Sequence, residues 1–137
     1  MRRLALVLLL VAAGCGASHG PEDVLREWSA AVNDADYERA ASLFAEGAEV
    51  VQGPRVRVFD TSEEARRWNA SLPCRARIVR AREDGDTVDA TFLLRDRADV
   101  PCDAPGAVAR VVARVEDGKI VLWHQVDSAT AEPEPVT

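Results

Sequence analysis

The sequence predicts an α+β domain whose N-terminal half supplies the helices and whose C-terminal half supplies most of an antiparallel sheet. Apolar residues recur at helical spacing over Pro21–Ala45 and again after Thr61. Two Asp-Gly pairs, Asp84-Gly85 and Asp117-Gly118, are each flanked by runs that read as strands. Asp-Gly favours a two-residue type I′ turn, in which both residues have a positive φ. Two long hairpins are therefore expected after the helices.

Residues 1–14 are interpreted as a signal peptide. Arg2-Arg3 supply its positive region, and the apolar run Leu4–Ala13 is too short to span a bilayer. Ala12-Ala13-Gly14-Cys15 resembles a bacterial lipobox, although alanine stands at position 12, where leucine is commonest. We expect lipidation of Cys15, followed by a short linker to residue 20. The alternative is ordinary secretion, with cleavage near Ala13 and a free Cys15 thiol.

The net charge indicates by what means the protein could attach to a membrane. Lys and Arg number 17 and Asp and Glu number 23, a formal net charge of −6. Loss of Arg2 and Arg3 with the signal peptide makes it about −8, which argues against nucleic acid and against electrostatic attachment to anionic lipid. An anchor of two or more acyl chains holds a protein on a membrane stably. The expected location is the bacterial cell envelope, outside the cytoplasm, as a membrane-anchored lipoprotein.

The domain is expected to open with two helices. Pro21 suits the first helical position. The apolar stripe of the first helix is Val24, Leu25, Trp28, Ala31 and Val32. Residues 33–36 interrupt the pattern and offer an aspartate cap for a second helix. The stripe of the second helix is Tyr37, Ala40, Ala41 and Phe44, with Gly47 as its stop.

Two short strands and a third helix come next. The strands are expected over Glu49–Gln52 and Arg55–Phe59, joined through Gly53-Pro54. Thr61-Ser62-Glu63-Glu64 has the spacing of a capping box, which starts a helix, and Pro73 ends it. Trp68 lies on the apolar face of this helix. Asn69 either tips into a pocket or lies at the border of the helix.

The hairpin Ala107–Val126 determines the candidate site. With Asp117-Gly118 as the loop, Val111 lies opposite His124 and Val112 opposite Trp123. The face expected to point inward comprises Val115, Ile120, Ala113, Leu122, Val111, His124, Ala109 and Val126. His124 is its one polar residue, either a structural histidine or a polar contact and acid–base group. The other face carries Val112, Val121 and Trp123, either as surface residues or as a homodimer face.

The hairpin Cys74–Arg95 is expected to pair Arg82 with Thr87 and Arg80 with Asp89. Its inward face then comprises Ala81, Val88, Val79, Ala90, Arg77, Phe92, Arg75 and Leu94. Arg75 and Arg77 either point into a pocket, where they suit a carboxylate or phosphate, or are turned outward by a β-bulge.

Cysteine usage indicates a disulfide between Cys74 and Cys102, which flank one hairpin of an exported chain. The sequence has no zinc-type cysteine spacing and no glycine-rich phosphate loop, so no metal and no cofactor are expected. Residues 21–127 form one domain, and 128–137 form an acidic tail expected to be disordered.

This order of elements resembles the nuclear transport factor 2-like superfamily, and within it the SnoaL-like domains of secreted bacterial proteins. The resemblance is carried by Trp28–Phe44 (WSAAVNDADYERAASLF), Leu72-Pro73-Cys74, and Asp117-Gly118-Lys119-Ile120 with Trp123. It implies a cone, also called cystatin-like: a strongly curved antiparallel sheet closed by three helices from the N-terminal half around a pocket.

The resemblance leaves the activity open, since the superfamily contains isomerases, cyclases, dehydratases and binding domains. Its ketosteroid isomerases use a carboxylate base with a tyrosine-containing oxyanion hole, whereas the inward strand faces predicted here carry no Asp or Glu. Tyr37 is the one tyrosine, and it starts a helix; Glu49 or Asp60 is the nearest substitute for a carboxylate. The predicted pocket comprises Trp28, Tyr37, Phe44, Trp68, Arg77, Phe92, Val111, Leu122 and His124.

Two functions follow from these residues. The first is a lipid-anchored binding or interaction module with a small apolar pocket and a small apolar ligand. The alternative is a small isomerase, cyclase or dehydratase that uses His124 as acid–base on a hydrophobic substrate, a role that normally requires a second partner.

Overall fold

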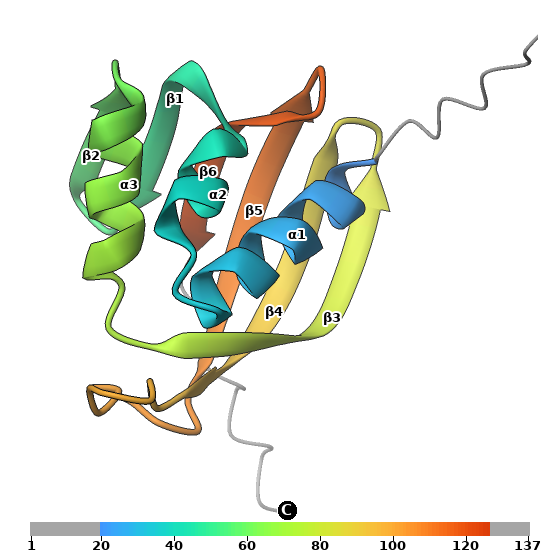
Figure 1. The fold of residues 1–137 in the computed structure, drawn as a ribbon. Helices are drawn as coiled ribbons and strands as arrows, with labels where there is room; N and C mark the ends of the chain where they lie inside the picture. Colours follow the sequence, from blue (N-terminus) through green and yellow to red (C-terminus); the bar gives the residue numbers. More distant parts are fainter. Residues whose placement is uncertain (1–19, 127–137) are drawn as a thin grey trace, which may run out of the picture.

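The computed structural model describes residues 20–126, which fold into one six-stranded sheet with three helices packed on one face (Figure 1). The helices are α1 (Pro21–Asn33), α2 (Tyr37–Ser42) and α3 (Ser62–Ser71). The strands are β1 (Phe44–Gln52), β2 (Arg55–Phe59), β3 (Arg75–Asp84), β4 (Thr87–Arg95), β5 (Val108–Glu116) and β6 (Lys119–Val126). The predicted α+β class and the placement of the helices are confirmed.

The sheet is mixed, whereas an antiparallel sheet was expected. Its strand order is β2-β1-β6-β5-β4-β3, and β1 pairs with β6 in parallel while the other neighbours are antiparallel. The first and last long strands meet in the middle of the sheet, so their relative direction is set by the path of the whole chain and not by a turn between them.

Several sequence expectations lie outside the described residues. They are the signal peptide, lipidation of Cys15, most of the linker that follows it, and the acidic tail over 128–137. Among the described helices, none is both long and apolar enough to cross a membrane.

The second helix is shorter than predicted. It ends at Ser42, and Leu43 caps it with its N–H on the carbonyl of Ala40. The carbonyl of Leu43 then accepts from the N–H of Ile120 at 2.8 Å, which draws the chain into the sheet. Phe44 therefore begins β1. Gly47, expected to stop the helix, has φ +79° within β1, where the pairing with β6 shifts register.

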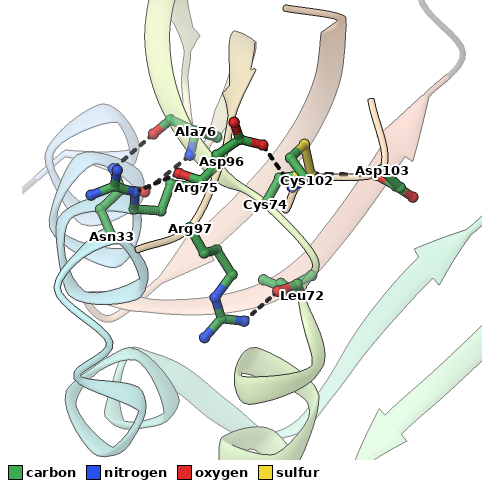
Figure 2. The surroundings of a disulfide bond; sticks show 9 residues. All are labelled: Asn33, Leu72, Cys74, Arg75, Ala76, Asp96, Arg97, Cys102 and Asp103. Atoms are coloured by element: carbon green, nitrogen blue, oxygen red, sulfur yellow. Dashed lines mark hydrogen bonds between the residues drawn. A yellow bond between two sulfur atoms is a disulfide. The ribbon is translucent and has the colours of Figure 1, made fainter. Parts of the chain in front are cut away.

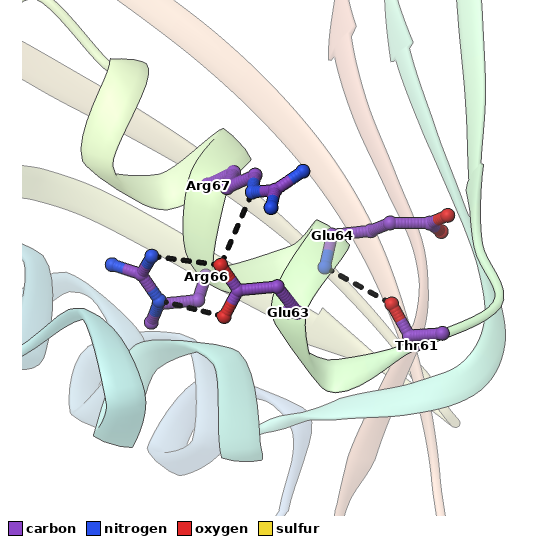
Figure 3. A network of polar contacts seen from close by, with 5 residues as sticks. All are labelled: Thr61, Glu63, Glu64, Arg66 and Arg67. Carbon is purple, nitrogen blue, oxygen red and sulfur yellow. Dashed lines mark hydrogen bonds and ion pairs between the residues drawn. The ribbon is translucent and has the colours of Figure 1, made fainter.

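Thr61 caps α3 as predicted (Figure 3), but the return bond from Glu64 goes to Asp60 instead of to Thr61 itself. Thr61 Oγ1 accepts from the N–H of Glu64 at 3.2 Å, and Glu64 Oε2 accepts from the N–H of Asp60 at 2.8 Å. Glu63 on the exposed first turn accepts from Arg66 and Arg67, and the hydrogen bond from Arg66 is the main reason that the pKa of Glu63 is lowered to about 2. The local sequence thus accounts for where this helix begins.

The β5–β6 hairpin has the predicted turn but a different register beyond it. Asp117 and Gly118 have φ values of +51° and +73°, and Val115 lies opposite Ile120. A bulge then places one extra residue, Val121, in β6, so that Ala113 pairs with Trp123 and Val112 with His124. Each residue of β6 beyond the bulge therefore faces the opposite side from the one predicted. Trp123 is buried inside and does not belong to an outer dimer face.

The β3–β4 hairpin also differs from the prediction. Its loop is Gly85-Asp86, because Asp84 pairs with Thr87, and Arg82 lies opposite Asp89 instead of Thr87. A bulge between Ile78 and Arg80 leaves Val79 exposed and reverses the faces of the residues before it. Arg75 and Arg77 are consequently exposed, as the bulge alternative anticipated, while Ala76 and Ile78 pack against the core. Val88, Ala90 and Phe92 of β4 point inward as predicted.

Candidate functional site

A cavity of about 360 Å³ lies between the C-terminal half of α1 and the inner face of the sheet. Its lining residues are Trp28, Ser29, Val32, Asn33, Gln52, Leu72, Pro73, Cys74, Ala76, Phe92, Leu94, Asp103, Ala104, Ala109, Val111, Trp123 and Gln125. Among them Pro73, Asp103, Ala104 and Gln125 are exposed, and we refer to these four as the cavity mouth. The small side chains of Ala76 and Ala109 leave space that larger residues on these strands would fill.

The cavity floor is aromatic. Trp28 packs edge-on against Phe92 with ring centroids 6.1 Å apart, and against Trp123 at 5.7 Å. All three rings line the cavity and are nearly fully buried. Trp68 of α3 packs behind Trp123 at 5.0 Å without lining the cavity. This floor provides an apolar surface for the body of a small molecule.

Asn69 holds Trp28 in place from within the core. Its side chain is fully buried, its Oδ1 accepts from Trp28 Nε1 at 2.8 Å, and its Nδ2 donates to the carbonyl of Ala65 at 2.8 Å. Neither position expected for Asn69 is correct, since it neither lines the cavity nor lies at an exposed helix border. It satisfies an indole N–H that would otherwise be buried without an acceptor.

A second tryptophan is bound to a pair of glutamines that the sequence analysis did not single out. Trp68 Nε1 donates to Gln52 Oε1 at 3.1 Å, and Gln52 Nε2 donates to Gln125 Oε1 at 3.4 Å. Gln52 ends β1 and pairs with Gln125 in the parallel β1–β6 ladder. This pairing depends on the β6 bulge and on contact between two strands that are distant in sequence, so no local sequence pattern predicts it.

The disulfide is confirmed and lies at the cavity mouth (Figure 2). Cys74 and Cys102 are bonded with their Cα atoms 4.6 Å apart. Asp103 Oδ1 lies 3.3 Å from Cys74 Sγ, a contact without a hydrogen bond because a disulfide sulfur carries no proton. The cluster of Cys74, Cys102 and Asp103 also offers no thiolate to a metal ion while the cysteines are oxidised.

Arg97 fixes the loop between β4 and β5 to the end of α3 (Figure 2). Its Nη1 donates to the carbonyl of Leu72 at 2.6 Å and to that of Ala70 at 3.2 Å. Its guanidinium also lies 5.3 Å from the centroid of the Tyr37 ring. Asp96 Oδ1 accepts from the N–H of Cys102 at 2.8 Å, so the loop that carries Asp103 is held at several points.

Comparison with known families agrees with this architecture. Residues 25–123 match the family model of the SnoaL-like domain. This chain belongs to the SnoaL-like family. The resemblance drawn from the sequence is thereby confirmed, and it covers nearly all the described residues.

Solved structures share the fold of this SnoaL-like domain at low sequence identity. An NTF2-like protein of unknown function from Cytophaga hutchinsonii has a TM-score of 0.67 at 15% identity, covering 81% of this chain and 92% of that one. A candidate ketosteroid isomerase from Kribbella flavida has 0.66 at 19%, covering 85% and 83%. IdmH, a candidate polyketide cyclase from Streptomyces antibioticus, has 0.61 at 19%, covering 79% and 91%. Comparison with curated proteins finds no match.

Three of the predicted pocket residues line the cavity of the SnoaL-like domain: Trp28, Phe92 and Val111. Trp68 lies one layer behind it, Phe44 packs against Phe59 in the core, and Tyr37 lies beneath Arg97. The Tyr37 hydroxyl is buried and has no hydrogen-bond partner among residues 20–126.

The other three predicted pocket residues lie on the outer face of the sheet and do not line the cavity. The bulges described above turn Arg77 and Leu122 away from the cavity, and His124 pairs with Val112 on the outer face of the sheet. The hypothesis that His124 acts as an acid–base group in the pocket is therefore wrong. The physical reason is the single extra residue in β6, which turns Trp123 and Gln125 inward instead.

Charged groups are sparse around the cavity of this SnoaL-like domain. Asp103 is the one acidic or basic side chain among its described lining residues, and it lies at the mouth. Glu49 and Asp60, considered as substitutes for a catalytic carboxylate, are exposed and do not line the cavity. The lining consists mainly of apolar side chains and neutral amides, which suits binding of an uncharged molecule.

Proposed function

We propose that this SnoaL-like domain is a binding module for a small, largely apolar molecule with one polar end. The observation that carries the proposal is the cavity of about 360 Å³ with an aromatic floor and neutral amides near its mouth. Binding cavities of this size are typically apolar with a few polar groups that fix the ligand's orientation. Trp28, Phe92 and Trp123 would hold the apolar body, and Gln125 would meet the polar end.

The binding proposal is tested by titrating the purified protein with 1-cyclohexylethanone, which has an apolar ring and one carbonyl. Trp28 and Trp123 line the cavity, so occupancy should change tryptophan fluorescence and shift the indole N–H signals of these residues in NMR spectra. Ala109→Leu places a larger side chain on the cavity wall and should abolish the response. Ala107→Leu, at an exposed position that does not line the cavity, is the control and should not.

The domain is further proposed to be held at a bacterial membrane by lipid on Cys15, outside the cytoplasm. This rests on the apolar run that stops at Ala13-Gly14-Cys15 in the sequence. Mass spectrometry of the protein from its native envelope should find an acylated N-terminal cysteine. A mature form with an unmodified Cys15 thiol contradicts the anchor and leaves the binding proposal intact.

The alternative is an enzyme of the isomerase, cyclase or dehydratase type, and one observation favours it. The carboxylate of Asp103 lies at the cavity mouth, where it would meet a proton on a bound substrate. Without His124, this carboxylate has no second acid–base group beside it among the described lining residues. Turnover of any substrate that is lost in Asp103→Asn and kept in Asp99→Asn, outside the lining, would establish the enzymatic function.

A further inference from the structure

The hydrogen bonds from Trp68 through Gln52 to Gln125 have a fixed direction. An indole N–H donates and never accepts, so the atom of Gln52 that faces Trp68 at 3.1 Å must be the oxygen. The nitrogen of Gln52 then faces Gln125, at 3.4 Å, and the atom it meets must be the Gln125 oxygen. These bonds leave the nitrogen of Gln125 as the amide end without a partner among residues 20–126. The buried indole of Trp68 thus determines that the Gln125 side chain presents its nitrogen, and not its oxygen, at the cavity mouth.

Other polar groups on the lining agree with this direction. Asn33 Oδ1 accepts from the N–H of Ala76 at 3.0 Å and its Nδ2 donates to the Ala76 carbonyl at 2.7 Å. All three amide oxygens on the lining side chains are therefore engaged, while Gln125 Nε2 has no partner within the described part of the chain. Trp123 Nε1 is likewise buried without a partner among residues 20–126. The lining amide and indole groups that have no hydrogen-bond partner among residues 20–126, Gln125 Nε2 and Trp123 Nε1, are therefore both donors.

The charge at the mouth limits what these donors can receive. Asp103 brings a carboxylate to the same mouth as Gln125, and no Lys, Arg or His from residues 20–126 lines the cavity. A ligand that ends in a carboxylate would be repelled there without a compensating cation. An uncharged oxygen accepts from an amide N–H without this cost.

We propose that the Trp68–Gln52–Gln125 relay presents the amide nitrogen of Gln125 as a fixed hydrogen-bond donor and so selects ligands whose polar end is an uncharged acceptor, such as a carbonyl oxygen. This inference rests on the proposed binding function and names the class of molecule that it takes. Gln125 makes the contact, whereas Gln52 and Trp68 act through it as positioning residues.

Three probes with one cyclohexyl body separate the possibilities: 1-cyclohexylethanone, cyclohexanecarboxylate and cyclohexyltrimethylammonium. Their dissociation constants are measured by NMR titration of the purified protein, with the side-chain amides of Gln52 and Gln125 as direct reporters. A net hydrogen bond contributes enough to change affinity about five-fold. The ketone should bind about five-fold more tightly than either charged probe, and it should shift the Gln125 amide signal.

Two variants test the relay itself. Gln125→Glu replaces the donor by a carboxylate and should cost about five-fold in ketone affinity while improving binding of the trimethylammonium probe. Gln52→Glu leaves Gln125 untouched but offers an oxygen to both Trp68 and Gln125. Gln125 must then turn its nitrogen toward the new carboxylate and expose its oxygen, so the ketone should again lose about five-fold.

The control for charge is Ala107→Glu, which adds a carboxylate at an exposed position just before β5 that does not line the cavity, and it should leave ketone binding within two-fold. Circular dichroism verifies that every variant is folded. Equal affinity for all three probes, or unchanged ketone affinity in Gln52→Glu and Gln125→Glu, overturns the relay while the binding function stands. No binding of any probe overturns both.

Discussion

The β3–β4 and β5–β6 hairpins each contain one β-bulge, yet the two bulges move opposite kinds of residue. In β3 the bulge at Val79 turns Arg75 and Arg77 out of the interior. In β6 the bulge at Val121 turns Trp123 into the interior and His124 out of it. One bulge keeps charge away from the core and the other completes the cavity floor. A one-residue insertion within a strand thus decides which side chains face the interior.

Removing Trp123 should have the largest effect, because the β6 bulge makes it part of the core. Trp123→Ala deletes a ring that packs against both Trp28 and Trp68 and should lower the free energy of unfolding by about 3–5 kcal/mol. Urea denaturation followed by circular dichroism measures the loss. A loss below about 1 kcal/mol would mean that Trp123 lies on the outer face, as an unbulged hairpin requires.

The β3–β4 hairpin differs from the β5–β6 hairpin because a disulfide lies at its open end. Removal of this disulfide should have the second largest effect on stability. Cys74 and Cys102 are separated by 28 residues in sequence. Replacing both by alanine should lower the free energy of unfolding by about 2–4 kcal/mol, mainly because the unfolded chain gains freedom. Chemical denaturation of the oxidised protein and the double variant tests this, and equal midpoints would contradict it.

An ion pair on the outer face joins the two hairpins and gives a smaller, pH-dependent effect. Arg110 Nε of β5 donates to Asp89 Oδ1 of β4 at 2.8 Å, and this bond lowers the pKa of Asp89. The carboxylate therefore stabilises the fold above the unfolded pKa of about 3.9, and this contribution is lost as the pH falls through the lower folded value. Because both side chains are partly exposed, Asp89→Asn should cost about 0.2–1 kcal/mol at pH 7.

Denaturation curves of the parent and Asp89→Asn at several pH values verify the sign. The difference between them should shrink as the pH is lowered from about 5 toward 2. A difference that grows on acidification would contradict the lowered pKa.

The smallest effect is expected at His124, the neighbour of Trp123 on the opposite face. His124→Phe should change the free energy of unfolding by no more than about 0.5 kcal/mol and leave binding of 1-cyclohexylethanone unchanged. Paired with Trp123→Ala, this variant compares two adjacent residues of one strand. Weaker ketone binding in His124→Phe would indicate that His124 lines the cavity, and it would contradict the bulge in β6.

Local signals in the sequence predicted the parts of the fold that local chemistry controls. Pro21, the helix cap at Thr61 and the turn at Asp117-Gly118 each act within a few residues of themselves, and the structure has all three. The register farther from a turn depends on how distant side chains pack. Trp123 enters the core because Trp28 and Trp68 occupy the adjoining space, and these rings come from helices remote in sequence.

The residues of the candidate site were the hardest to predict, because their orientation depends on this distant packing. A pattern that alternates from the turn places His124 inward and Gln125 outward, and one extra residue in β6 reverses both. Gln52 was also not predicted as a site residue, because its role depends on the parallel pairing of β1 with β6 and on the indole of Trp68. Trp28, Phe92 and Val111 were predicted correctly, since no bulge lies between each of them and its nearest local signal.

The direction of α1 has a consequence for how ligands would arrive. The helix starts beside the β3–β4 turn, where the N–H of Glu22 donates to Glu83 at 2.9 Å, and ends at Asn33, which lines the cavity (Figure 1). Its 13 residues span about 20 Å. With Cys15 acylated as proposed, the bilayer adjoins the start of α1 and the cavity lies toward the distal end of the domain. A ligand would then have to reach the end of α1 that is remote from the anchor.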